Sequence, residues 1–236
     1  MKCTLCGAEL RGTYLIDSWQ QPICTSHKVE YCSSCGRFVK PSDFRLSDGR
    51  CLCSFCKPSV VSLPQHVEWV EKRVRSILHT HGIKDMPKEI SIKLVTPAEM
   101  AKLNGKGQIN LLQPGLACTS RTVGLFVSRC KHTIYIFDHL PKIKFAGVLA
   151  HEMLHAWQYE KGISMPPMLT EGFCNLGSYV VYAAINTELS QHLMKSLEED
   201  VDPIYGDGFR KVLEVYRQQR DLQKTMSVIN NITNLK

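Results

Sequence analysis

The stretch LAHEMLHAW, residues 149–157, carries two histidines four positions apart, with a glutamate directly after the first. Apolar residues recur at helical spacing over residues 145–157, which predicts a largely buried helix. His151 and His155 then share one helix face about one turn apart, so both imidazoles can reach one ion. Glu152 lies beside them and can reach a water on that ion. The alternative interpretation is a pair of core histidines with backbone partners.

A third metal ligand is expected downstream, at Glu171 in the sequence LTEGFCN. This residue begins the next predicted helix, so a helix–loop–helix connection can return it to His151 and His155. Glu160 fits poorly as a ligand because it lies nine residues after His151. That separation corresponds to about 13 Å of helical rise and places Glu160 on roughly the opposite face of the helix from His151. The three ligands leave one tetrahedral zinc position for water, and Glu152 is the expected general base.

The sequence does not decide which residues would support this centre. Asn175 lies one turn after Glu171, and its carbonyl oxygen could accept a hydrogen bond from the outer N–H of a ligand histidine. A merely solvated Asn175 is an equal alternative. A donor for the reaction's oxyanion is also needed. The candidates, each more often a packing residue than a catalytic one, are Tyr179, Tyr182, His192 and Tyr205.

Eight of the eleven cysteines lie in the first 56 residues and form an internal repeat. The two units are Cys3-x2-Cys6-x17-Cys24-x2-His27 and Cys32-x2-Cys35-x17-Cys53-x2-Cys56. Two close pairs per unit match a closed, tetrahedral structural zinc site, whereas a chance cluster of reduced thiols would not repeat its spacing. The counterpart of Cys51 is Pro22, so Cys51 is not an expected ligand. The remaining cysteines, expected to be small buried side chains, are Cys118, Cys130 and Cys174.

Two consecutive zinc sites with a short hinge resemble a LIM domain. The order of the middle pair departs from that family, because Cys24 precedes His27 here. The gap from His27 to Cys32 is also longer than usual. The segment is therefore LIM-like, and the resemblance implies a module that binds protein segments, with nucleic-acid binding, known for treble-clef and ribbon relatives, as the alternative.

The rest of the chain alternates helical and strand patterns. Capping signals, Gly and Pro positions and apolar periodicity mark the boundaries. The expected helices cover residues 64–82, 97–104, 141–161 and 169–184, and the expected strands cover residues 90–95, 116–120, 123–128 and 133–137.

Composition excludes some classes of protein. The formal net charge is +7, but the basic residues are scattered, which favours a mildly basic solvated surface over a nucleic-acid-binding one. No run of 18 apolar residues exists, so no transmembrane helix or membrane partner is expected. The opening MKCTLCGAEL lacks the apolar core of a signal peptide, which predicts a cytoplasmic protein.

The combination of LIM-like zinc sites, LAHEMLHAW, LTEGFC and DPIYGDGFR (residues 202–210) resembles the plant ubiquitin-activated LIM peptidases that limit organ size, and their bacterial homologues. The resemblance covers nearly the whole chain. It implies a gluzincin-type endopeptidase that cleaves protein substrates, with zinc on His151, His155 and Glu171 and with Glu152 catalytic. The plant members carry ubiquitin-interacting motifs before the LIM region, and none is expected ahead of Cys3.

The sequence thus predicts an α+β protein with a LIM-like double zinc module at residues 1–60. A zincin-like metallopeptidase domain, with a small antiparallel or mixed sheet and active-site helices, is expected at residues 61–236. Its expected cofactors are one catalytic and two structural zinc ions, and its expected partners are a protein or peptide substrate and a protein bound by the LIM-like module. The alternative function is a non-enzymatic, zinc-stabilised interaction scaffold.

Overall fold

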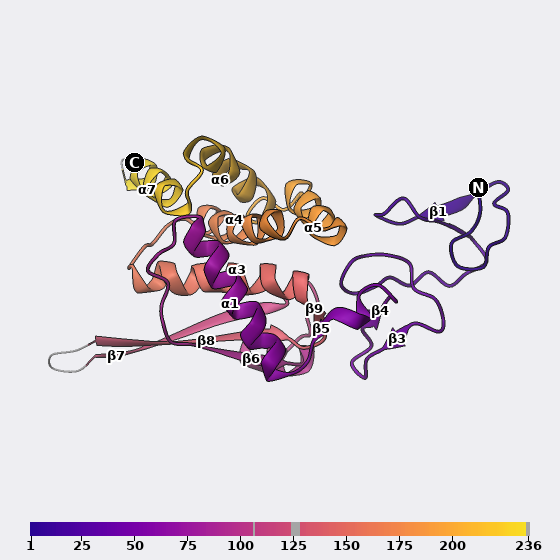
Figure 1. Ribbon diagram of the computed structural model, residues 1–236, viewed down its shortest axis with the longest axis horizontal. Coiled ribbons are helices and arrows are strands. Elements are labelled where there is room, and N and C mark those ends of the chain that lie inside the picture. Colours follow the sequence, from indigo (N-terminus) through magenta and orange to yellow (C-terminus); the bar gives the residue numbers. More distant parts are fainter. Residues whose placement is uncertain (106, 124–127, 235–236) are drawn as a thin grey trace. The chain divides into compact units, whose positions relative to one another are not determined.

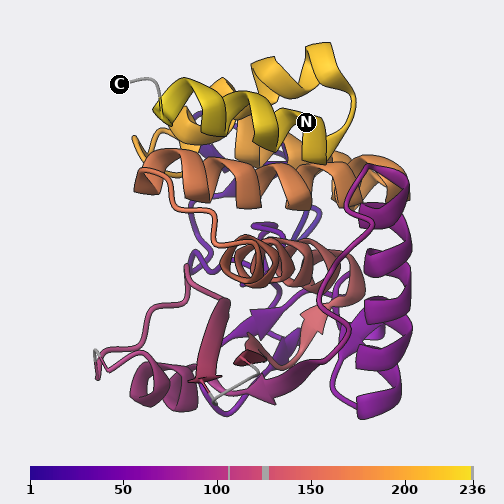
Figure 2. The ribbon, with the colours of Figure 1, turned by 90° about the vertical axis from the view of Figure 1, so that its left-hand side faces the viewer.

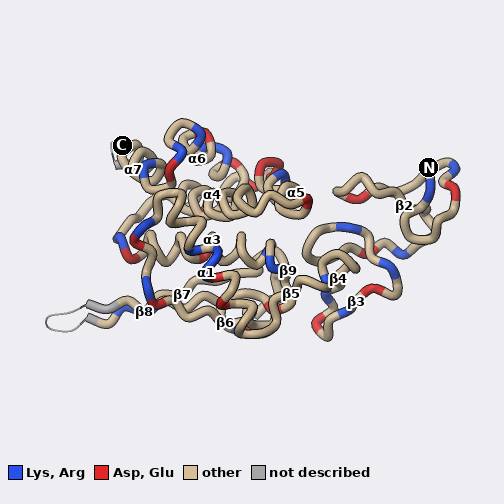
Figure 3. The backbone as a smooth tube through the Cα atoms, in the orientation of Figure 1, with Lys and Arg blue, Asp and Glu red and all other residues tan. Residues whose placement is uncertain are grey.

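The computed structural model describes residues 1–105, 107–123 and 128–234, and it shows a mixed α+β fold (Figure 1). The chain forms two compact units. The first is Met1–Val60 with His139–Pro141, and the second is Val61–Asp138 with Lys142–Lys236. Basic and acidic residues are interspersed along the chain in each unit (Figure 3). Within the part of the chain that the structure describes, no helix has the length and apolar character needed to cross a bilayer.

The two cysteine repeats of the first unit fold alike. In the first repeat β1 (Tyr14–Ile16) pairs antiparallel with β2 (Pro22–Cys24), and in the second β3 (Phe44–Arg45) pairs antiparallel with β4 (Cys51–Leu52). Gly7 and Gly36 both adopt positive φ, of 77° and 75°, in the tight turn after the second cysteine of each repeat. Glycine is suited to this conformation because it has no Cβ to clash with the backbone.

A buried aspartate joins the two repeats. The carboxylate of Asp17, which is 4 % exposed, accepts hydrogen bonds from the backbone N–H groups of Trp19, Gln21 and Phe38 at 2.9, 2.9 and 3.1 Å. The Phe38 side chain packs in a small core with Ile23. The unit continues through the short 3₁₀ helix η1 (Lys57–Ser59) into β5 (Val60–Val61), which pairs with β9 (Leu140–Pro141).

A three-stranded mixed sheet forms one layer of the second unit. Its strand order is β6-β8-β7, with β6 (Ile90–Val95) parallel to β8 (Ser128–Phe137) and β7 (Gly115–Val123) antiparallel to it. The predicted separate strand at residues 123–128 is wrong at its described ends, because Val123 ends β7 and Ser128 begins β8. Its middle, residues 124–127, lies outside the described residues.

Two cysteines of this sheet are not buried as expected. Cys118 is exposed and Cys130 is partly exposed. Strand side chains alternate between faces, so Cys118 points away from the face on which Gly115 meets the neighbouring helix. Of the three isolated cysteines, all of which lie in described positions, Cys174, which lies on a helix, is the one that is buried as expected.

Seven α-helices complete the second unit within its described residues. They are α1 (Pro64–Thr80), α2 (Pro97–Leu103), α3 (Lys142–Glu160), α4 (Pro167–Ile185), α5 (Glu188–Glu198), α6 (Gly206–Gln219) and α7 (Leu222–Asn234). Figure 2 shows α3 seen end-on between the sheet and α4, with α6 and α7 beyond α4. The helix α3 is therefore enclosed, and its fully buried side chains include Phe145, Leu149 and Trp157, which form much of the core.

Small residues let α3 and α4 approach closely. A Cβ on Gly147 would lie 2.2 Å from the Tyr182 hydroxyl, and a Cβ on Gly177 would lie 2.5 Å from Cδ1 of Leu154. Between them, the Ser178 hydroxyl donates a hydrogen bond of 2.8 Å to the Gly147 carbonyl. This close packing brings the first turns of α4 beside the middle of α3, where the histidines lie.

Candidate metal centres

The structure brings His151, His155 and Glu171 together at one point between α3 and α4. Nε2 of His151 lies 3.1 Å from Nε2 of His155. Oε2 of Glu171 lies 3.2 Å from the first nitrogen and 3.4 Å from the second. Ligand atoms bound at 2.0–2.1 Å to a tetrahedral zinc lie roughly 3.3 Å from one another. The three atoms therefore have the spacing of three ligands on one such ion. Glu160 lies elsewhere, at 2.9 Å from Nε2 of His132.

Each ligand histidine contacts a residue of α4. Oδ1 of Asn175 lies 3.0 Å from Nδ1 of His151. The thiol of Cys174 is hydrogen-bonded to the His155 ring, and one ligand atom from each of His151, His155 and Cys174 lies within 4.8 Å of the others. Consecutive residues of one helix thus contact both rings, and hydrogen-bond partners outside the ligand set can orient metal-binding histidines.

The ionisable groups around this point would stabilise a bound cation. Burial alone would raise the pKa of Glu171, but hydrogen bonds from His151 and His155 lower it to about 2. Burial opposes a charge on His155, yet interactions with Cys174, Glu171 and the glutamate at 152 raise its pKa to about 11. The His155 ring therefore holds a proton beside an ionised Glu171, and the same negative charge would stabilise a divalent cation bound at this point.

Glu152 lies beside the ligand cluster, on the sheet side of α3. Its side chain is almost fully buried, and burial raises its pKa. The backbone N–H of Ala117, on the edge strand β7, donates a hydrogen bond to its carboxylate. The carboxylate also touches the backbone of Gly115, where an added Cβ would lie 2.5 Å from Oε1 of Glu152. A strand and a helix together thus hold this carboxylate in place.

The four residues considered as oxyanion donors lie in different surroundings. The Tyr179 ring packs on Phe209, with centroids 5.4 Å apart, and its hydroxyl interacts with Glu198 and Arg217. Tyr182 is buried against α3. His192 lies on α5 and is half-buried. Of the four, Tyr205 is the residue whose pKa is raised by the Glu171 carboxylate, after burial as the largest cause, and the residue is 41 % exposed.

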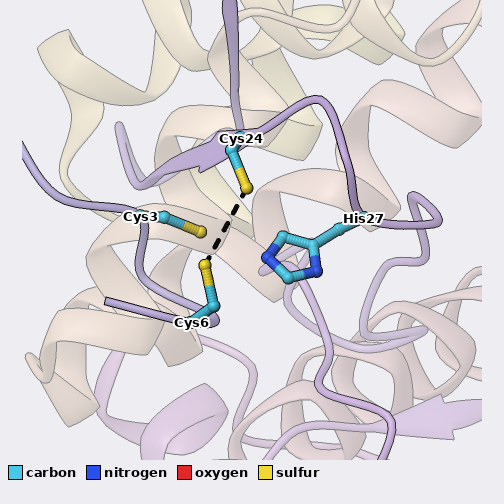
Figure 4. A group of neighbouring side chains, drawn as sticks. All are labelled: Cys3, Cys6, Cys24 and His27. Carbon is cyan, nitrogen blue, oxygen red and sulfur yellow. Dashed lines mark hydrogen bonds between the residues drawn. The ribbon is translucent and has the colours of Figure 1, made fainter. Parts of the chain in front are cut away.

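The first cysteine repeat gathers Cys3, Cys6, Cys24 and His27 around one point (Figure 4). The sulfurs of Cys6 and Cys24 are 3.9 Å apart, close to the roughly 3.8 Å between two thiolates bound at 2.3 Å to a tetrahedral zinc. Nε2 of His27 is buried with no hydrogen-bond partner among the described residues. Burial raises the pKa of Cys3, but backbone hydrogen bonds outweigh it and lower the value to about 6. These groups could hold a metal ion.

The second repeat gathers four cysteines that are all buried: Cys32, Cys35, Cys53 and Cys56. The sulfurs of Cys35 and Cys53 are 3.7 Å apart, again the spacing of two thiolates on zinc. Cys51 lies outside this group, and its sulfur accepts a hydrogen bond of 2.9 Å from the Arg45 guanidinium. The second group could also hold a metal ion, with all four positions occupied by protein.

The region that holds both histidines and Glu171 matches a known family. Residues 114–182 match the sequence model of the family described as DA1-like: Protein DA1. The chain has DA1-like homologues. The matched region begins just before β7 and ends within α4, so it contains every element that forms the centre described above.

Three relatives from Arabidopsis thaliana are similar at low identity. Protein DA1 is 26 % identical over 81 % of this chain and 47 % of its own length. Protein DA1-related 1 is 24 % identical over 82 % and 46 %, and Protein DA1-related 2 is 26 % identical over 81 % and 49 %. The chain thus spans about half the length of these curated relatives. No solved structure matches.

Sequence reasoning missed two residues of the centre. The sequence predicts a strand that starts one residue after Gly115, and it gives Cys174 no role beyond that of a small buried side chain. A glycine at the start of a strand can indicate close approach of another element, and that signal could have identified Gly115. Cys174 lies three residues after Glu171, on the same helix face, and this spacing was the available signal.

Proposed function

We propose that the chain is a zinc-dependent endopeptidase. One observation carries the proposal: the ligand atoms of His151, His155 and Glu171 lie 3.1 to 3.4 Å apart, with Glu152 beside them. Three protein ligands leave one position of a tetrahedral zinc for water, whereas a structural zinc has four. The homology to DA1-like proteins over residues 114–182 supports the assignment of this region as the functional one.

His151, His155 and Glu171 would hold the zinc, which when bound lowers the pKa of a water and polarises the scissile carbonyl. Glu152 accepts the proton of the attacking water and delivers it to the leaving amine. Burial raises the pKa of this carboxyl, which makes it a stronger base toward the proton of the water. The Ala117 N–H fixes the direction of the carboxylate.

The strand β7 supports a peptide as substrate. It is the edge strand of the sheet, and the N–H of Phe137 donates to the Pro114 carbonyl. In an antiparallel ladder, hydrogen-bonded and non-hydrogen-bonded pairs alternate, so the backbone groups of Gly115, Ala117 and Thr119 face away from β8. An extended peptide can pair with the backbone groups of Gly115 and Thr119 and with the Ala117 carbonyl, which would lay its backbone beside Glu152.

The first unit would hold two further zinc ions as structural elements. Neither cysteine-rich group leaves a ligand position open, because each contributes four ligands. We infer that this LIM-like unit binds a protein segment. Metal binding would also stabilise the unit, since its small apolar core could contribute little alone.

A peptide library tests the function. The metal-loaded full chain, its Glu152→Gln variant and a Glu160→Gln control are incubated with mixed peptides, and the products are identified by mass spectrometry. Cleavage is expected from the wild type and the control and not from Glu152→Gln, with three zinc ions per chain in all three proteins. Full activity of Glu152→Gln would remove Glu152 from the mechanism. Three bound metals without any cleavage would favour the non-enzymatic scaffold instead.

A further inference from the structure

The segment YGDGFR, residues 205–210, takes no part in the ligand set, yet it is tightly built. Just before it, the Asp202 carboxylate accepts hydrogen bonds from the N–H groups of Ile204 and Tyr205, at 2.8 and 2.9 Å. The Asp202 carbonyl also accepts from the N–H of Gly206 at 2.8 Å. These bonds form a fixed turn that places Tyr205 directly before the first residue of α6.

The two glycines of the segment pack directly against the backbone of neighbouring residues rather than against their side chains. A Cβ on Gly206 would lie 2.0 Å from the Asp200 carbonyl oxygen, and a Cβ on Gly208 would lie 2.1 Å from the Met168 carbonyl oxygen. A Cβ on Gly172, the residue after Glu171, would lie 2.4 Å from the backbone of Gly208. The start of α6 therefore rests on α4 next to a metal ligand, and only glycine permits that approach.

Arg210, the last residue of the segment, connects the start of α6 to the end of α5 and to Asp200 just after it. The Arg210 guanidinium donates a hydrogen bond of 2.9 Å to the Glu198 carbonyl and a second one to the Asp200 carbonyl. It also forms an ion pair with Asp207. The end of α5, the turn and the start of α6 are thereby tied into one rigid piece.

Asn175 joins this piece to the histidine ligands. Its Nδ2 donates a hydrogen bond of 3.2 Å to the Tyr205 carbonyl, and its Oδ1 lies 3.0 Å from Nδ1 of His151. The same amide side chain therefore fixes Tyr205 and one imidazole relative to each other. Both groups can keep this separation only as long as the turn stays seated on α4.

Tyr205 lies one amide side chain away from a ligand histidine, through Asn175, and the start of α6 that follows it rests on Gly172, the residue after Glu171. A phenol is protonated at neutral pH, so this side chain can donate a hydrogen bond. Burial is the largest cause that raises its pKa further, followed by the carboxylates of Glu171, Asp202 and Glu152 and then by Cys174. Tyr205 is also half-exposed, so a bound peptide can reach it.

We propose that Tyr205 donates a hydrogen bond to the carbonyl oxygen of the scissile peptide as that oxygen becomes an oxyanion, and that the YGDGFR segment is its positioning element. The inference rests on the proposed peptidase function and names a further catalytic residue for it. Such a donor acts mainly on the transition state, because negative charge develops on the oxygen only there. The matched control is Tyr179, whose hydroxyl faces Glu198 and Arg217 instead.

Steady-state kinetics on the metal-loaded full chain give the first test. Tyr205→Phe is expected to lower kcat about 10²-fold with little change in KM, as removal of one oxyanion donor does. Zinc content and melting temperature should stay at wild-type values, and Tyr179→Phe should retain wild-type kcat. A wild-type kcat in Tyr205→Phe, with Glu152→Gln inactive, would overturn this inference alone and leave the peptidase proposal intact.

Binding gives a second test that does not depend on turnover. A phosphinic peptide presents a tetrahedral, negatively charged oxygen where the oxyanion forms, and its affinity is measured by calorimetry. Tyr205→Phe should bind it at least about tenfold more weakly, since hydrogen bonds to charged groups are strong. In a Glu152→Gln background, the affinity for uncleaved substrate should be the same with Tyr or Phe at position 205. Equal phosphinic affinity in wild type and Tyr205→Phe, or an absence of binding, would contradict the assignment.

Discussion

Nε2 of Gln158 donates a hydrogen bond of 3.1 Å to the sulfur of Cys174. The same sulfur is hydrogen-bonded to the His155 ring. Both Gln158 and Cys174 are almost completely buried, so neither group can exchange its partner for water. The thiol thus forms the middle of a chain that runs from α3 to α4 and back to a ligand histidine.

Replacing Cys174 should weaken the metal centre. Loss of a group that orients a ligand typically costs about 10- to 100-fold in metal affinity, so Cys174→Ala should bind zinc at this centre that much more weakly. The measurement is competition with a chelator of known affinity. Cys130→Ala, on a strand away from the ligands, should keep wild-type affinity. An unchanged affinity in Cys174→Ala would show that His155 needs no support from the thiol.

Replacing Gly115 should displace Glu152. An alanine Cβ would lie 2.5 Å from Oε1 of Glu152 and 2.7 Å from Cγ1 of Val148. Overpacking of this kind typically costs about 1–3 kcal/mol, so Gly115→Ala should unfold at lower denaturant concentration and cleave more slowly. Ser120→Ala, on the exposed part of the same strand, is the control. Wild-type cleavage by a stable Gly115→Ala protein would mean that β7 does not position the carboxylate.

Zinc counting distinguishes Cys53 from its near neighbour Cys51. Both are buried, but only Cys53 belongs to the second cysteine group. Metal analysis of the purified full chain should find three zinc ions in Cys51→Ser and fewer in Cys53→Ser. The physical reason is that a closed tetrahedral site loses most of its affinity with one of four ligands. Equal zinc content in the two variants would contradict the ligand assignment.

The ion pair of Asp85 predicts a pH dependence of stability. Hydrogen bonds from Lys161 and from Trp157, the latter at 2.8 Å, hold the pKa of Asp85 below its ordinary value. A lowered folded-state pKa means that the stabilisation is fully present above about pH 4, the ordinary Asp value, and is lost as the pH falls through the folded-state pKa. Asp85 is 41 % exposed, so the ion pair should contribute under about 1 kcal/mol.

Urea unfolding of wild type and Asp85→Asn at several pH values checks this prediction. The difference in unfolding free energy should be constant from pH 5 to pH 7 and should shrink below about pH 4. A difference that grows on acidification would have the wrong sign for a lowered carboxyl pKa. The Asn side chain can still accept from Trp157, so the comparison isolates the charge.

Several elements could be predicted from local sequence. The strand at Ile90–Val95 has the predicted bounds, and the helix that carries both histidines begins and ends within a residue of the predicted ones. These elements are set by short-range signals: alternation, helical periodicity and a capping box at Thr96. The ends of β7 and β8 were harder to predict. Pairing between the two strands, rather than an apolar pattern in either one, extends β7 to Val123 and begins β8 at Ser128.

The sequence by itself determined which residues could meet as ligands within one element or repeat. Histidines four apart on a helix share a face, and two repeats 29 residues apart fold into matching cysteine groups. The tertiary structure alone decided which residues surround the ligands. Gly115, Cys174 and Tyr205 reach the centre through a strand edge, a helix face and a turn on separate segments. Their positions depend on how closely helices and strands pack, and no local spacing encodes that distance.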